Sequence, residues 1–130
     1  MTPATAKRKG AETEEWWCEY LRANGAPHAE RRHLAGSFDK GDIAGLPGQV
    51  HEVKSGARLD LSGWMDELRV EVRNAGAAFG VLVIRPKGKP NPSDWWCVVT
   101  PGTLTALMQE AGWLVPPADL EQPDSEARWL

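Results

Sequence analysis

The stretch GDIAGLPGQVHEVKSG, residues 41 to 56, carries charged side chains among small and apolar residues. Asp42, Glu52 and Lys54 form the pattern D-x9-E-x-K. Burying such charges is costly unless something neutralises them. Two carboxylates beside an ammonium group suit a hard divalent cation, because Mg2+ takes oxygen ligands and keeps several waters or substrate phosphate oxygens. A cation held there would activate water and polarise a phosphodiester, while Lys54 would orient the water or offset charge in the transition state.

The pattern alone is weak evidence, because it arises by chance in on the order of one chain in several. The ordinary alternative is a hairpin whose charges face water on one side. An ordinary solvated hairpin would, however, show more polar residues than this segment does. The context therefore favours charges that converge.

Two short strands joined by a turn at Pro47-Gly48 are predicted for this segment. Because side chains alternate along a strand, Glu52 and Lys54 share one face. A two-residue turn would pair Asp42 with Val53, whereas a three-residue loop would set Asp42 directly across from Glu52. Pro-Gly fits tight two-residue hairpins poorly, which favours the longer loop or a bulge.

The elements expected around this hairpin follow from hydrophobic periodicity and from Gly and Pro punctuation. The expected order is α, β, β, β, α, β, β, α, which indicates the α/β class with a mixed β-sheet flanked by helices. Outside the hairpin, the sequence predicts helices over residues 11–25, 61–76 and 101–112, and strands over residues 28–34, 79–86 and 95–100. The run FGVLVIRP is expected to be buried on both faces.

Glu14 lies on the apolar stripe of the first predicted helix. Residues 14, 17, 18 and 21 fall on one helical face, so this acid heads the stripe that Trp17, Cys18 and Leu21 bury. Glu14 is therefore expected to point inward and to serve as a third acid at the metal site. Its ordinary alternative is stabilisation of the helix dipole in the first turn.

Length and composition indicate one folded domain, since 130 residues can bury a sizeable core. We expect a single domain over residues 1–114, with a basic start at 1–9, and an acidic, proline-containing tail at 115–130. Both ends are expected to be mobile. The N-terminal residues show no signal peptide or membrane anchor, and the two separated cysteines fit a reducing interior. The expected location is the cytoplasm.

The net charge of −3 argues against a nucleic-acid partner, because affinity for phosphates comes from Lys and Arg. The acids are unevenly distributed, however. Residues 115–130 hold four acids and one base, which leaves 14 of each in residues 1–114. Cations bound to some of those acids would make the surface more positive still. Charge therefore neither supports nor excludes a polyanionic partner.

The D…ExK pattern, preceded by a helix with a glutamate, resembles the PD-(D/E)XK nuclease superfamily, specifically its Holliday junction resolvase-like members. Those enzymes often begin with Lys-Gly, a glutamate four residues after the glycine, and a glycine eleven residues further on. Lys9-Gly10, Glu14 and Gly25 match this spacing, and Ala35-Gly36-Ser37 matches the small-residue loop that precedes the aspartate. Gly41 stands where proline is usual.

The resemblance covers about residues 7 to 100 and implies a restriction-endonuclease-like core. It implies a Mg2+-dependent endodeoxyribonuclease, with Mn2+ able to substitute, that cuts branched DNA such as a Holliday junction. It also implies a two-fold homodimer with one active site for each of two strands. The implied catalytic residues are Asp42, Glu52, Lys54 and Glu14, of which the three acids bind the metal.

Two alternatives to a junction resolvase stay open. One is another nuclease of the superfamily, acting on flaps, ends or linear duplex. The other is a nucleic-acid-binding or protein-interaction module that kept the fold without catalysis.

Basic residues near the predicted site are candidates for contact with DNA phosphates, although simple solvation explains them equally well. The candidates for DNA contact are Lys9, Arg31, Arg32, Ser37, Lys40 and Arg58. The charged positions of the second predicted helix, Asp66, Glu67, Arg69, Glu71 and Arg73, are expected to form a solvated face with local ion pairs.

Overall fold

The computed structural model describes residues 3–33, 39–56 and 58–120. The predicted order of helices and strands is confirmed, with two short 3-10 turns added. The elements are α1 (Pro3–Ala23), β1 (Glu30–Arg31), β2 (Ile43–Ala44), β3 (Gln49–Ser55), α2 (Leu61–Ala75), β4 (Phe79–Arg85), η1 (Pro92–Asp94), β5 (Trp96–Val98), α3 (Pro101–Glu110) and η2 (Pro117–Asp119).

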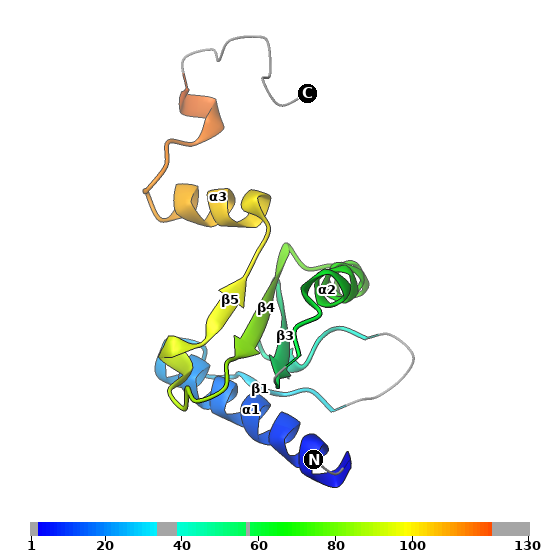
Figure 1. Ribbon diagram of the computed structural model, residues 1–130. Helices are drawn as coiled ribbons and strands as arrows, with labels where there is room; N and C mark the ends of the chain where they lie inside the picture. Colours follow the sequence, from blue (N-terminus) through cyan, green and yellow to red (C-terminus); the bar gives the residue numbers. More distant parts are fainter. Residues whose placement is uncertain (1–2, 34–38, 57, 121–130) are drawn as a thin grey trace. The chain divides into compact units, whose positions relative to one another are not determined.

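A mixed three-stranded sheet in the order β3-β4-β5 forms the centre of the first part of the chain. Strand β3 runs parallel to β4, and β4 runs antiparallel to β5. Helices α1 and α2 lie on opposite faces of this sheet (Figure 1). Because β4 lies between two strands and two helices, its residues 81 to 84 are buried, as predicted from the apolar run.

Alternation along the strands separates two apolar clusters. Val53, Val81 and Val83 pack with α1 residues that include Trp17 and Cys18. On the other face, the cluster consists of Val50, Leu82 and Ile84 from the strands together with Leu68 from α2. Glu52 and Lys54 have the parity of Val50, so the strand directs them to the α2 face.

The predicted hairpin between residues 42–46 and 50–54 is wrong. Strand β2 pairs antiparallel with β1, with Arg31 opposite Ile43, and forms a separate two-stranded sheet. The turn at Leu46–Gln49 redirects the chain into β3, which pairs with β4. The apolar residues of β3 pack on both helices, and the parallel partner β4 supplies that burial better than a short hairpin strand would.

Element boundaries also differ from the prediction. Helix α1 begins at Pro3, so the start that was expected to be mobile is helical from this residue. Alanine, lysine and arginine favour helix, and proline is tolerated in the first turn. Helix α2 ends as predicted at Gly76, which adopts a left-handed conformation with φ of 60°.

By internal contacts the chain forms two compact units, Met1–Val99 and Thr100–Leu130. The predicted domain of residues 1–114 therefore includes α3, which belongs to the second unit. Within that unit, Thr100 caps α3 by accepting a hydrogen bond from the Thr103 amide at 3.3 Å. Across the described residues, no helix combines the length and apolar character needed to cross a membrane.

Gly41 is required by the conformation of the chain before Asp42. Its φ of 93° cannot be adopted by proline, so proline cannot stand at this position. A Cβ atom at this position would lie 2.6 Å from Val50 Cγ1 and 3.1 Å from the His51 carbonyl oxygen.

We predict that Gly41→Ala lowers the free energy of unfolding more than Gly48→Ala does. Both positions have positive φ, so each variant loses about 1–2 kcal/mol to backbone strain. Gly48 has open space where its Cβ would lie, whereas overpacking at Gly41 adds about 1–3 kcal/mol. Urea unfolding of the two variants measures the difference, and equal losses would contradict the packing argument.

Candidate active site

Asp42 reaches the edge of β3 by hydrogen bonds that do not belong to a strand ladder. Its backbone amide donates to the His51 carbonyl at 3.0 Å, and the Val53 amide donates to Asp42 Oδ2 at 2.7 Å. These two contacts bracket Glu52 on the strand. Asp42 and Glu52 are therefore neighbours, as predicted. The hydrogen bond from the Val53 amide to the Asp42 side chain brings them together, and not the predicted pairing of two strands.

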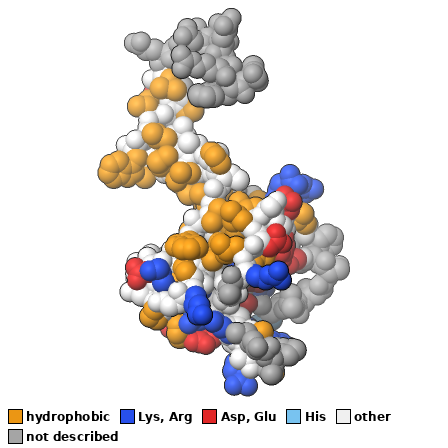
Figure 2. Space-filling model, in the orientation of Figure 1, with side chains coloured by type: hydrophobic (Ala, Val, Ile, Leu, Met, Phe, Trp, Pro, Cys, Tyr) orange, Lys and Arg blue, Asp and Glu red, His pale blue; other side chains and the backbone are white. Residues whose placement is uncertain are grey.

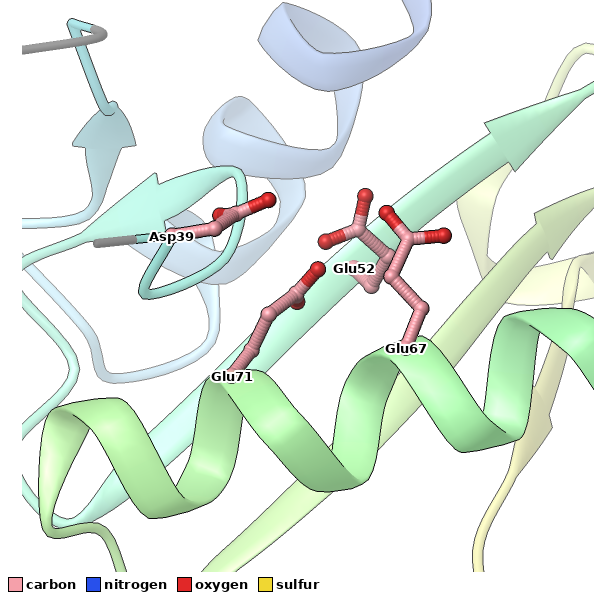
Figure 3. Close-up of side chains that lie close together, drawn as sticks. All are labelled: Asp39, Glu52, Glu67 and Glu71. Carbon is pink, nitrogen blue, oxygen red and sulfur yellow. The ribbon is translucent and has the colours of Figure 1, made fainter. Parts of the chain in front are cut away.

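Further carboxylates approach Glu52 from α2 and from the chain before Asp42. Asp39, Glu52, Glu67 and Glu71 each offer one oxygen, and these oxygens all lie within 4.8 Å of one another. Figure 3 shows Glu67 and Glu71 rising from α2 toward Glu52 on β3, with Asp39 on the adjacent loop. We call these four residues together with Asp42 the acidic cluster.

The centre of the acidic cluster is deeply buried. Glu52 is 4% exposed and Glu71 is 1% exposed. Oε2 of Glu52 and both carboxylate oxygens of Glu71 have no hydrogen-bond partner among the described residues. Since a buried carboxylate is stable only when paired, hydrogen-bonded, protonated or bound to a cation, these oxygens are open to a ligand or a proton.

Burial and mutual repulsion keep protons on this cluster when no cation is present. Desolvation is the largest cause that raises the pKa of Glu52 to about 9, and the nearby Glu71 adds to it. Desolvation likewise raises the pKa of Asp42 to about 8, followed by repulsion from Glu52. The pKa of Glu71 rises to about 7, again mainly through burial. Around neutral pH the metal-free cluster therefore retains protons that isolated carboxyl groups would lose.

Lys54 provides partial neutralisation. Its Nζ lies 3.6 Å from Glu52 Oε1 and 3.5 Å from Glu67 Oε2, and 5.7 Å from the centroid of the Trp64 ring. Burial alone would lower the pKa of Lys54, but attraction to Glu52 and Glu67 raises it above its ordinary value. The lysine is thus a fixed cation beside the cluster. Its single positive charge neutralises only part of the negative charge that the carboxyl groups would carry when ionised.

His51 lies on the opposite face of β3 and anchors the strand to α1. Trp17 Nε1 donates to His51 Nδ1 at 3.0 Å, which leaves Nε2 to donate to Gln49 Oε1, also at 3.0 Å. Burial lowers the pKa of His51 to about 4, so the ring is neutral. His51 therefore lies away from Glu52 and has a structural role in this fold.

Glu14 does not belong to the group of converging oxygens. Its Oε2 accepts from Arg31 Nε at 3.0 Å. Its charge contributes to the raised pKa of Asp42, but less than burial and repulsion from Glu52 do. The predicted role of Glu14 as a metal ligand stays a prediction, and it would require release from Arg31.

The predicted DNA contacts are scattered. Arg31 is paired with Glu14, and Arg32 donates to the Ile43 carbonyl oxygen at 3.5 Å. Lys40 and Arg58 are exposed, and Lys9 is half-buried at the rim of a cavity. Ser37, like the rest of the small-residue loop before the aspartate, lies outside the described residues.

The predicted solvated face of α2 is corrected at Glu71. This residue is buried because it follows Trp64 by seven residues and Leu68 by three, which places it on the stripe that packs against the sheet. That spacing was visible in the sequence and identifies Glu71 as a charged residue at an apolar position. Glu67 is exposed, yet it turns toward Lys54 and the cluster.

Comparisons with known proteins leave the family open: no family model, curated protein or solved structure matches the chain. The resemblance to nucleases therefore depends on the motif spacing alone.

We predict that the metal-free protein loses stability as pH rises from 6.5 to 9. The folded-state pKa values of Asp42, Glu52 and Glu71 are raised, so the folded chain binds more protons than the unfolded chain in this window. Each excess proton lowers the free energy of unfolding by about 1.4 kcal/mol per pH unit. Urea unfolding with EDTA at several pH values measures the slope.

The slope should become shallower in Glu52→Gln and stay unchanged in Asp66→Asn, an exposed position on α2. The other charged groups at this site are Lys54, Asp39 and Glu67, and exposure of the last two screens their effect. A slope that is identical in wild type and Glu52→Gln would contradict the assignment.

Proposed function

We propose that this protein is a divalent-cation-dependent nuclease that hydrolyses phosphodiester bonds in DNA, built on a restriction-endonuclease-like core. One observation carries the proposal: buried carboxylate oxygens without hydrogen-bond partners, Oε2 of Glu52 and both oxygens of Glu71, converge beside Lys54. Such a cluster is unfavourable in the absence of a cation. Its oxygen donors suit Mg2+, with Mn2+ as a substitute.

Asp42, Glu52 and Glu71 are the residues that would hold the cation. When bound, the cation supplies a lowered pKa for water and polarises a phosphoryl oxygen. Asp42 is oriented by the Val53 amide, which donates a hydrogen bond to Oδ2. Lys54 stands beside Glu52, where its ammonium group orients the attacking water or offsets charge that develops on the phosphate.

Branched DNA and a two-fold homodimer come from the resemblance and not from the geometry. In this proposal each subunit cuts one of two strands, and a four-way junction is the substrate that uses both sites. The second unit exposes apolar side chains that would suit a subunit contact. These side chains are Leu104, Leu107, Trp113, Leu114 and Val115.

We predict metal-dependent cleavage that requires Asp42. Purified protein is incubated with labelled four-way junction, flap and linear duplex, with Mg2+ or with EDTA. Asp42→Asn should reduce cleavage by at least about a hundredfold, because it removes charge and a ligand from the cation site. Asp66→Asn, which makes the same chemical change at an exposed position of α2, should cut like wild type.

The substrate pattern separates the alternatives. Paired, symmetric nicks in the junction alone support a resolvase, and equal cutting of all three substrates supports a less selective nuclease. Binding without cutting under every metal condition would overturn the catalytic proposal and favour an inactive binding module.

We predict that Glu71→Gln raises the unfolding temperature of the metal-free protein at pH 8 and reduces the further rise caused by Mg2+ or Mn2+. The amide keeps the shape of the side chain while removing an unpaired buried acid. Thermal unfolding with EDTA and with a series of cation concentrations measures both effects without a cleavage assay. Glu110→Gln, on α3, is the control. An unchanged cation response would remove Glu71 from the metal site.

A further inference from the structure

A second charged feature lies at the end of the sheet, on the side of α1. A cavity of about 350 Å³ is lined by Lys9 of α1, by Gly56, by Arg85 and by residues 86–90 that follow β4. Its lining carries four cations and, among the described residues, no carboxylate. In Figure 2, basic side chains appear on the surface over α1 and the end of β4.

Arg85 is held in place at the base of this cavity. Its Nη1 donates to Thr13 Oγ1 at 3.0 Å, and its guanidinium carbon lies 4.3 Å from the centroid of the Trp16 ring. Glu12 Oε1 approaches at 3.9 Å, but its side chain is 44% exposed, so this ion pair is weak. The planar guanidinium retains donors for an anion, because these contacts use few of its five N–H groups.

The segment that carries the other two cations forms a tight turn. The Lys89 amide donates to the Pro86 carbonyl at 3.3 Å, and Gly88 has φ of 80°, which a type II turn requires. Trp95 Nε1 donates to the Lys89 carbonyl at 2.8 Å. Lys87 and Lys89 are therefore exposed side chains on an anchored backbone, so little loop ordering is needed before they contact an anion.

This cavity lies next to the proposed active site along the strands. β3 and β4 are parallel, with Lys54 opposite Ile84 and Ser55 opposite Arg85. The chain leaves β3 through Gly56, which lines the cavity two residues after Lys54. Lys54 faces α2 and Arg85 faces α1, so the cavity and the proposed active site lie on opposite faces at the same end of β3 and β4. A DNA strand that passes around this end of the sheet would contact both.

We propose that the cavity formed by Lys9, Arg85, Lys87 and Lys89 binds a backbone phosphate of DNA on the α1 side of the sheet end, away from the scissile phosphate on the α2 side. This inference rests on the proposed function for the identity of the polyanion. The chemistry of the site fits a phosphate because a held guanidinium and three ammonium groups line the cavity, no carboxylate lines it among the described residues, and the nearby Glu12 pairs only weakly with Arg85. The four-way junction and linear duplex share this backbone, so the cavity would serve both.

The test uses the full-length protein with EDTA, so that binding is measured without cleavage. Fluorescence anisotropy follows labelled junction and duplex between 50 and 200 mM salt, for wild type and for the double variant Lys87→Ala/Lys89→Ala. The variant should bind about tenfold more weakly at the lower salt concentration. Its slope of log affinity against log salt should fall by about 1.

The matched control is Arg69→Ala/Arg73→Ala, which removes two exposed cations from α2. It should change affinity less than threefold and keep the slope. Thermal unfolding checks that each variant is folded. Equal losses in the two double variants, an unchanged slope in the cavity variant, or no DNA binding by wild type at 50 mM salt would each overturn the inference.

Two further readouts separate this inference from the proposed function and from a small ligand. If wild type binds DNA through the cavity but never cuts with Mg2+, the nuclease proposal fails and the cavity assignment stands. If wild type cuts DNA with Mg2+ and the cavity variants bind DNA normally, the nuclease proposal stands and the cavity assignment fails. Saturable calorimetric binding of inorganic phosphate to wild type, lost in Lys87→Ala/Lys89→Ala while DNA affinity is unchanged, would assign the cavity to a free anion and overturn the inference.

Discussion

The cost of burying charge on the α2 face of β3 is the constraint on which the site depends. Glu52 occupies a buried strand position between Val50 and Lys54 on the same face of β3. Glu71 then adds a second acid from α2 at a position that packs like a core residue. A folded chain tolerates this arrangement only with protons or a cation in the cluster, and each of these neutralises the same repulsion.

The rest of the first unit holds these acids in place. On the far side of β3, the contact between Trp17 and His51 ties the strand to α1, so the strand cannot rotate away from α2. On the near side, Leu68 packs against the sheet one turn before Glu71. Gly41 allows the sharp path that brings Asp42 to the Val53 amide. The acids of the cluster therefore come from three parts of the chain, the segment before β2, β3 and α2, and the cluster is a consequence of the tertiary fold.

The sequence predicted the order of elements and the neighbourhood of Asp42 and Glu52, but not the strand pairing or the side-chain contact with the Val53 amide that brings Asp42 to β3. Alternation identified the face of Glu52 and Lys54, because period-two patterns depend only on the strand itself. Strand β2 pairs with β1 because β3 pairs with β4 instead. β4 buries β3 better than β2 would, and it lies about 30 residues further along the chain, so local patterns around β2 and β3 do not predict the pairing. Glu71 was missed because its charge led to its assignment to the solvated face, although its spacing from Trp64 and Leu68 places it on the buried stripe.

Acidic and basic groups are separated across the end of the sheet, and this separation bears on how a chain with a net charge of −3 could bind a polyanion. The buried acids face α2, while Arg85 and the turn at 86–89 lie on the α1 side. Because the pKa values of Glu52 and Asp42 are raised, the cluster presents less negative charge than its composition suggests. A bound divalent cation would reduce that charge further. The field near the ends of β3 and β4 is then set mainly by Lys54, Arg85, Lys87 and Lys89, so the local potential and not the net charge governs the approach of DNA.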